Sequence, residues 1–249
     1  MGFTADLPSI EPKAPASSVI PTAGFRVPYV VGFTGEGEQR HHLMWTSSLS
    51  GLRLGYAPFS RRGDYSNGVL RLRQHQNRTG RPDFKTVNTR RQWACMERLQ
   101  CQICARSAVD PYTGRIWWLL SALNDESFGG VYTNAPPTCL ACIPEAISYC
   151  PHLRRNAAIF TVGACTPFGV RADVFEPLLP LITPVARNAI VTFNDDHLPH
   201  AVARELLVLL HDVRPAEVDQ SSIRDRPSPN LSLPPSADMA IRHTHLQRS

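Results

Sequence analysis

Lysine is scarce in this chain: only Lys13 and Lys85 stand among the 26 basic residues of a 249-residue sequence. Long apolar runs are missing as well, and because a transmembrane helix needs about 20 mainly apolar residues, none is expected. Residues 1–18 lack the basic start and apolar stretch of a secretory signal. The lack of a transmembrane helix and of a secretory signal predicts a cytoplasmic protein.

Several catalytic signatures are absent too. The sequence contains no glycine-rich dinucleotide motif, no P-loop and no serine nucleophile elbow. The motifs therefore place the chain in none of these nucleotide-binding or hydrolase classes.

The chain has seven cysteines, and in a reducing compartment spaced cysteines are more often metal ligands than disulfides. Four of them form two Cys-x-x-Cys pairs, "CQIC" and "CLAC". Zinc prefers four tetrahedral ligands, and a Cys-x-x-Cys turn presents two sulfurs to one ion. We predict a structural Zn²⁺ site whose ligands are Cys101, Cys104, Cys139 and Cys142.

Other interpretations of the cysteines stay open. The paired cysteines could be buried free thiols, or a redox pair, although the latter is typical of a thioredoxin-like βαβ setting. Cys150 and His152 could be substitute ligands or lie beside the site. The short helix before them would be about 12 Å long, so one ion does not easily reach both of its ends. We interpret Cys95 and Cys165 as core thiols.

The chain as a whole predicts an α+β protein. Residues 1–24 and 214–249 are rich in proline and serine and are predicted to be disordered. We expect a small β-rich region over 25–88, a helix plus a treble-clef-like zinc unit over 89–155, and a βα region over 156–213.

Three helices are predicted. "TRRQWACMERLQCQIC" has apolar residues on one face of about three turns. A short helix over 142–150 has a proline in its first turn. The clearest apolar stripe lies in "LPHAVARELLVLLHDV" and predicts a helix over 198–213. Its residues are Val202, Leu206, Leu209, Leu210 and Val213.

Short strands are predicted where β-branched and aromatic residues cluster between turn residues. "NRTGRPDF" is interpreted as a turn. The predicted strands are "HHLMWTS", "GLRLGYAP", "GVLRLRQ", "GRIWWLLSAL", "AAIFTVGAC", "FGVRADVFEP" and "NAIVTFNDDH".

Basic charge is concentrated in residues 61–106, the arginine segment. It holds eleven Arg or Lys residues and three acids, so it carries +8 while the whole chain carries +5. Arginine interleaved with Tyr65, Phe84 and Trp93 is typical of a nucleic-acid surface. A solvated arginine-rich face is the other interpretation. The predicted nucleic-acid-binding residues are Arg61, Arg62, Arg71, Arg73, Arg78, Arg81, Arg90 and Arg91.

Two further polar groups could form a catalytic or metal site. His41 and His42 are adjacent, and "NDDH" combines Asp195, Asp196 and His197. The simpler interpretation is a pair of surface imidazoles and a helix-capping turn.

The layout over 101–153 resembles treble-clef proteins, including the HNH endonuclease class, in which two Cys-x-x-Cys pairs brace a ββα unit. The matching residues are "CQIC", "CLAC" and, before the second pair, Gly129, Gly130 and Asn134. An HNH nuclease uses a histidine as general base, and none lies between His75 and His152.

A second combination, "RPDF", "CQIC", "WWLL", "PPTCLAC" and "CPHL", resembles zinc-binding proteins of unassigned function from high-GC actinobacteria. Because those proteins have no assigned function, this resemblance implies none for the chain.

Two classes of function are therefore expected. The first is a zinc-stabilised, non-enzymatic binding or regulatory protein that contacts nucleic acid or a protein partner through the arginine-rich face. The second is an enzyme, a degenerate HNH-like nuclease or another metal-dependent hydrolase, with the 41–42 or 195–197 residues in its site. A membrane partner is not expected.

Overall fold

The computed structural model describes residues 26–38, 42–48, 51–120, 131–177 and 182–217. Strands predominate over these residues, and three α-helices accompany them. The α+β class is therefore confirmed. The segment 1–24 predicted to be disordered, and all but the first four residues of 214–249, lie outside the described residues.

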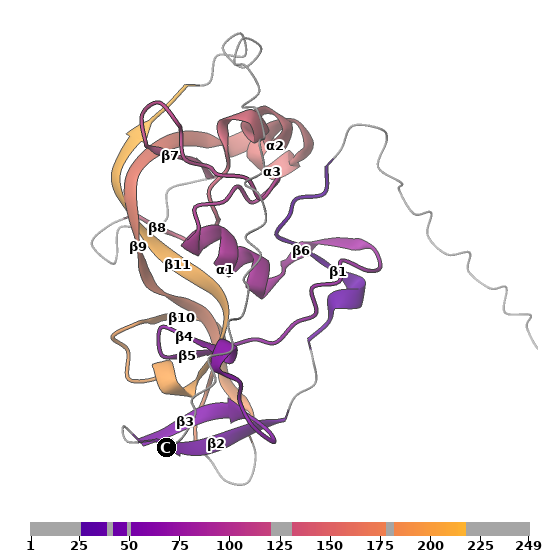
Figure 1. Cartoon of the computed structure of the whole chain (residues 1–249), viewed down its shortest axis with the longest axis vertical. Helices are drawn as coiled ribbons and strands as arrows, with labels where there is room; N and C mark the ends of the chain where they lie inside the picture. Colours follow the sequence, from indigo (N-terminus) through magenta and orange to yellow (C-terminus); the bar gives the residue numbers. More distant parts are fainter. Residues whose placement is uncertain (1–25, 39–41, 49–50, 121–130, 178–181, 218–249) are drawn as a thin grey trace, which may run out of the picture. The chain divides into compact units, whose positions relative to one another are not determined.

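Two long antiparallel strands form the middle of the main sheet (Figure 1). They are β9 (Ala158–Phe175) and β11 (Ala201–Pro215), which pair along most of their length. β7 (Ile116–Leu120) pairs with the beginning of β9, and β8 (Tyr132–Thr133) pairs with the middle of β11. The two strands predicted between 157 and 177 are thus one continuous strand.

Three more strands complete the main sheet at the end of β9 and the beginning of β11. β10 (Pro184–Thr192) pairs antiparallel with β9. β5 (Val69–Arg71) pairs parallel with β11, and β4 (Tyr65–Ser66) pairs with β5. The strand order is β10-β9-β11-β5-β4, with β7 and β8 branching from the two long strands.

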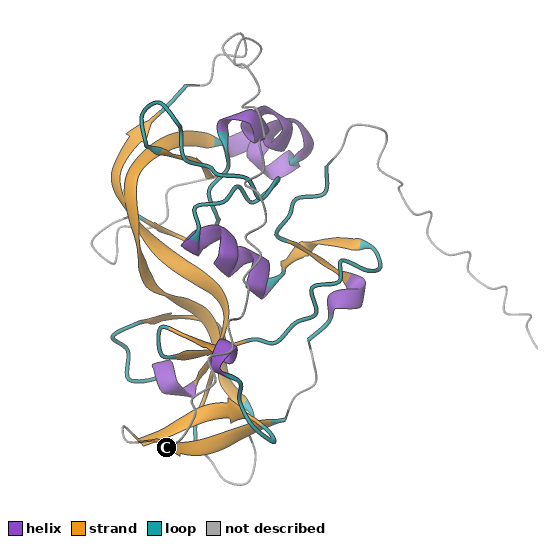
Figure 2. Cartoon of the chain, in the orientation of Figure 1, coloured by secondary structure: helices purple, strands orange, loops and turns teal. Residues whose placement is uncertain are grey.

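Two small two-stranded sheets lie outside the main sheet (Figure 2). β2 (Leu43–Ser48) pairs with β3 (Gly51–Tyr56), and both were predicted as strands. β1 (Val31–Phe33) pairs with β6 (Pro82–Val87), although only a turn was predicted there. β6 begins with a proline and exposes three of its residues, so it lacks the apolar alternation that predicts a strand.

The helices are α1 (Thr89–Glu97), α2 (Ile143–Tyr149) and α3 (Pro151–Asn156). α2 confirms the short helix predicted over 142–150. The 3-10 turns of the described residues are η1 (Thr34–Glu36), η2 (Arg62–Asp64), η4 (Leu140–Cys142) and η5 (Leu198–His200).

The ends of α1 have local causes. Asn88 caps the helix, because its side chain accepts a hydrogen bond from the Arg91 N–H at 3.3 Å. The helix ends at Glu97, two residues before Leu99, whose φ of 52° is left-handed. α1 is therefore shorter than the predicted helix, which ran on toward the first Cys-x-x-Cys pair.

α1 packs against the main sheet through apolar and polar contacts. Trp93 of α1 and Trp118 of β7 are fully buried in the same core cluster. Gln92 donates a hydrogen bond to the Leu206 carbonyl and accepts one from the Leu206 N–H, both at 2.9 Å. These bonds satisfy the backbone of β11 between the two shifts in its pairing with β9.

The helix predicted over 198–213 is wrong: the residues from 201 onward form strand β11. Leu206, Leu207 and Val208 are consecutive and all buried, whereas a surface helix buries one face. A central strand covered on both faces is a continuous apolar run, and in this run the i, i+3, i+4 spacing of a helix occurs as well. Tertiary pairing overrides the helix propensity of its Ala, Arg, Glu and Leu residues.

None of the helices that the structure describes is long and apolar enough to cross a bilayer.

Candidate metal centre

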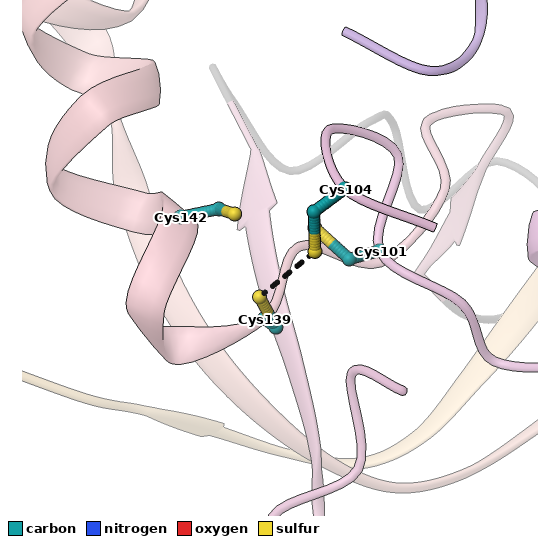
Figure 3. A group of neighbouring side chains, drawn as sticks. All are labelled: Cys101, Cys104, Cys139 and Cys142. Atoms are coloured by element: carbon teal, nitrogen blue, oxygen red, sulfur yellow. Dashed lines mark hydrogen bonds between the residues drawn. The ribbon is translucent and has the colours of Figure 1, made fainter. Parts of the chain in front are cut away.

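The side chains of Cys101, Cys104, Cys139 and Cys142, the four-cysteine cluster, point toward a common centre (Figure 3). All four sulfurs lie within 4.8 Å of one another, and those of Cys104 and Cys139 are 3.7 Å apart. Two of these cysteines are buried and two are half-buried, and none is in a disulfide. The structure thus brings together the four residues that the spacing singled out.

The first pair lies in a tight turn directly after α1. The Cys101 N–H donates to the Arg106 carbonyl at 2.7 Å, and the Ala105 N–H donates to the Cys101 carbonyl at 2.8 Å. The Ile103 N–H points at the Cys101 sulfur at 3.4 Å. Ala105 has a left-handed φ of 60°, which lets the chain reverse direction after the second sulfur.

The second pair lies at the start of α2. The Cys142 N–H donates to the Cys139 carbonyl at 2.9 Å within the 3-10 turn that leads into the helix. A proline in the first turn and Glu145 follow, both of which favour a helix start. The two sulfurs are thus held by a turn and a helix N-terminus that the local sequence specifies.

Hydrogen bonds connect the two halves of the cluster and fix them to the sheet. Gln102 donates from its backbone to the Pro137 carbonyl at 2.9 Å and from its side chain to the Thr138 hydroxyl at 2.8 Å. The Thr138 N–H donates to the Trp117 carbonyl of β7 at 3.0 Å. The Tyr29 N–H donates to the Ile103 carbonyl at 3.1 Å, which attaches the N-terminal segment.

The geometry fits a tetrahedral metal. Metal–sulfur bonds of about 2.3 Å in a tetrahedron place two sulfurs about 3.8 Å apart. The separation between Cys104 and Cys139 is 3.7 Å, far longer than the roughly 2.05 Å of a disulfide. Four sulfurs within 4.8 Å of one another could therefore bind one metal ion after a small contraction.

The electrostatics favour a cation as well. Hydrogen bonds from the neighbouring sulfurs, first that of Cys101, lower the pKa of Cys104 and so favour its thiolate form. Hydrogen bonds with the same neighbours raise the pKa of Cys142, because a second negative charge so close is repelled. A divalent metal removes that repulsion and allows four thiolates to coexist.

Two arginines contact the sulfurs from outside the cluster. The Arg26 guanidinium donates from Nη1 to the Cys142 sulfur at 3.9 Å. Arg106 is hydrogen-bonded to Cys104, and this contact raises the pKa of the Arg106 guanidinium. A metal with four thiolates is net negative, so the two cations complement it. Neither arginine was predicted at the site; the position of Arg106 two residues after Cys104 was the available signal.

The other cysteines lie outside the cluster. Cys95 is a fully buried core thiol, as predicted, and burial raises its pKa to about 12. Cys165 is half-buried against the core. Cys150 stands between α2 and α3, and neither it nor His152 belongs to the group of possible metal ligands found among the described residues.

The arginines predicted to contact nucleic acid lie in different environments. Arg73 and Arg91 are buried in ion pairs with Asp64 and Glu36, both at 2.5 Å. Arg71 is half-buried and donates to the Gly63 carbonyl at 2.5 Å. The side chain of Arg62 is outside the described residues. The four exposed members are Arg61, Arg78, Arg81 and Arg90.

The buried pair of Arg91 and Glu36 is structural. The Glu36 carboxylate accepts two bonds from Arg91, at 2.5 and 2.6 Å, and one each from the backbone N–H groups of Phe33 and Arg78 and from the Asn88 side chain. Burial alone would raise the pKa of Glu36, but these hydrogen bonds lower it below its usual value. The pair ties α1 to η1, the 3-10 turn that follows β1.

The remaining predicted groups show no assembled site. Asp195 accepts from the His197 N–H at 2.8 Å and contacts the His197 ring at 2.9 Å, which is the turn that leads into η5. His41 lies outside the described residues, and His42 is exposed. Gly129 and Gly130 are also outside them, and the treble-clef description stays a prediction.

Comparisons with known proteins gave no relative: no family model, no curated protein and no solved structure matches this chain.

Proposed function

We propose that the chain is a zinc-stabilised, non-enzymatic binding protein that contacts nucleic acid through its exposed arginines. The convergence of four sulfurs within 4.8 Å carries this proposal. Four cysteine ligands fill the tetrahedral shell of zinc and leave no position for a substrate or a reactive water, which is typical of a structural site.

Zinc is the metal of the proposal because the donor set consists of sulfur alone. Thiolates in a tetrahedral arrangement select zinc or an iron–sulfur centre, and the 3.7 Å separation of Cys104 and Cys139 matches one zinc ion. Cys101, Cys104, Cys139 and Cys142 would hold the ion, which supplies structural stability and no chemistry.

Nucleic acid is the proposed partner because one segment of the chain concentrates positive charge and leaves several of its arginines exposed. The arginine segment carries +8, and Arg61, Arg78, Arg81 and Arg90 remain exposed after folding. Phe84, which is 60% exposed, stands near Arg81 in the chain and offers a surface for base stacking. A protein partner with an acidic surface is the competing outcome of the test.

The test is binding of the zinc-loaded full chain to mixed-sequence DNA and RNA, measured by fluorescence anisotropy over a range of salt concentrations. Because each neutralised phosphate releases counterions, affinity should fall steeply and linearly on a log–log plot against salt. A chelator-treated sample should bind much more weakly. Absence of binding, or affinity that does not depend on salt, would contradict the proposal.

A further inference from the structure

A depression open to solvent lies directly beside the four-cysteine cluster. Its volume is about 540 Å³, and Arg26, Tyr29, Arg78, Cys104 and Arg106 belong to its lining. Clefts that bind ligands commonly measure about 300–1,000 Å³, so this one accepts a group of nucleotide size. Among the residues that the structure describes, no aspartate or glutamate lines it.

Its three arginines come from three distant parts of the chain. Arg26 precedes β1, Arg78 lies in the turn before β6, and Arg106 follows the first Cys-x-x-Cys pair. The Tyr29 N–H bond to Ile103 brings the first and third parts together, and the Arg78 N–H bond to Glu36 fixes the second. The fold, rather than a local run of basic residues, creates this concentration of charge.

None of the three guanidinium groups forms an ion pair with a carboxylate of the described residues, whereas Arg73 and Arg91 are each paired with a buried one. The Glu36 carboxylate beside the Arg78 backbone is neutralised by Arg91. Glu145 accepts from the Arg26 backbone N–H at 3.2 Å.

Other contacts hold these guanidinium groups in place. Arg26 contacts the Cys142 sulfur, Arg106 contacts Cys104, and the Arg78 guanidinium lies 5.0 Å from the centre of the Phe33 ring. A guanidinium has five N–H donors in a planar fork, so a single sulfur or ring contact leaves donors for a ligand. Arginine forks match the oxygens of phosphate, and converging cations are stabilised by an anion between them.

We infer that the depression lined by Arg26, Arg78 and Arg106 binds a phosphate group of a single-stranded nucleic acid, with Tyr29 available to stack on a neighbouring base. This inference rests on the proposed function and names its contact point. The open form of the depression suits a polymer that enters and leaves it, and base–aromatic stacking tolerates any sequence. Arg26 contacts the Cys142 sulfur and Arg106 lies beside Cys104, so binding of a metal by the four-cysteine cluster should be connected with ligand binding.

Arg78→Gln is the decisive variant, because the Arg78 guanidinium lies over Phe33 rather than against a sulfur, and glutamine keeps the backbone N–H that donates to Glu36. Binding of a labelled, mixed-sequence single strand should weaken about tenfold, and the slope of log affinity against log salt should become shallower by about 0.7. The matched control is Arg187→Gln on β10, whose side chain is 72% exposed outside the depression; its affinity should stay within about twofold of the wild type.

Arg26→Gln and Arg106→Gln form the second test, with zinc content measured on the same samples. Variants that keep their zinc and still lose affinity support direct phosphate contact. Wild-type protein that binds no strand would overturn this inference together with the proposed function. Wild-type binding that none of the three variants weakens, while Arg61→Gln or Arg90→Gln does, would overturn the site alone. Binding of inorganic phosphate without binding of the strand would also overturn it.

Discussion

The main sheet and the metal centre are stabilised by different kinds of interaction. In the β9–β11 pair, backbone ladders and consecutive buried residues such as Leu206 and Val208 supply the stability. In the metal centre, residues 101–106 and 139–150 contain no strand of the sheets, and four sulfurs take the place of a ladder. The sheet is therefore expected to survive loss of the metal, and the centre is not.

The comparison extends to charge. Around the sheet and α1, arginines such as Arg91 are buried and paired with a carboxylate, so they act as structural residues. Around the metal centre, Arg26 and Arg106 meet sulfur instead. An arginine buried against a carboxylate uses its N–H donors within the fold, whereas an arginine that contacts one sulfur keeps further N–H donors for an anion.

Removing one metal ligand should have the largest effect. Cys139→Ser should release the metal and reduce the free energy of unfolding by about 5 kcal/mol or more, because structural zinc contributes roughly 10 kcal/mol in small domains. Hydrogen exchange should show residues 101–106 and 139–150 opened while the β9–β11 amides stay protected. The matched control is Cys150→Ser, a cysteine of the same segment outside the cluster, which should keep the metal. Equal losses of metal and of unfolding free energy in both variants would contradict this contrast between the sheet and the metal centre.

Breaking the buried ion pair of Arg91 and Glu36 should have the second largest effect on the free energy of unfolding. Arg91→Ala leaves the Glu36 carboxylate buried without its partner, which costs about 3–5 kcal/mol of unfolding free energy in a urea titration. Arg90→Ala, at the exposed neighbouring position, should change it by no more than about 0.5 kcal/mol. A small effect of the first variant would show that β1 and η1 are held against α1 by other contacts.

Shortening a buried side chain of the sheet should reduce the free energy of unfolding by a smaller amount and should leave the metal bound. Leu206 is 1% exposed, and Leu206→Ala should destabilise the protein by about 3 kcal/mol through lost burial and a cavity. Leu52→Ala, where the side chain is 44% exposed, is the control, with an expected change below about 1 kcal/mol. Loss of zinc from Leu206→Ala would mean that the two regions are not separable.

Lowering the pH should have the smallest effect on the stability of the fold. The pKa of Glu36 is lower in the folded chain than its usual value of 4.5, so the unfolded chain binds more protons between the two values. This carboxylate therefore stabilises the fold above about pH 5, and its contribution is lost as pH falls through the folded pKa. Glu36→Gln should flatten the pH dependence of the urea midpoint, and an unchanged profile would exclude the pair as its cause.

The features that were predicted correctly depend on a few neighbouring residues, and those that were missed depend on contacts between residues far apart in the sequence. The four cysteines, α2 and β7 depend on spacing, a helix start and a run of aromatic and leucine residues, which are all visible over a few positions. The strand at 201–215 was predicted as a helix, because a fully buried strand and a helix share apolar spacing.

The arginines show the same limit. Glu36 and Arg91 are 55 residues apart, and nothing near either residue indicates that they are paired. Arg26 stands far from the first Cys-x-x-Cys pair in the chain and is brought to the cluster by the backbone bonds of Tyr29 and Val30 and by its own bond to Glu145. Which arginines are buried and which face an anion is decided by pairing across the fold, and residue spacing does not report it.

The central claim is that four cysteines hold one metal ion, and metal content tests it most directly. Full-length protein purified without added metal should contain one zinc per chain by elemental analysis. The thiols of Cys101, Cys104, Cys139 and Cys142 should resist titration until the chain is denatured or a chelator is added. Native protein without metal, in which these four thiols titrate freely, would contradict the account.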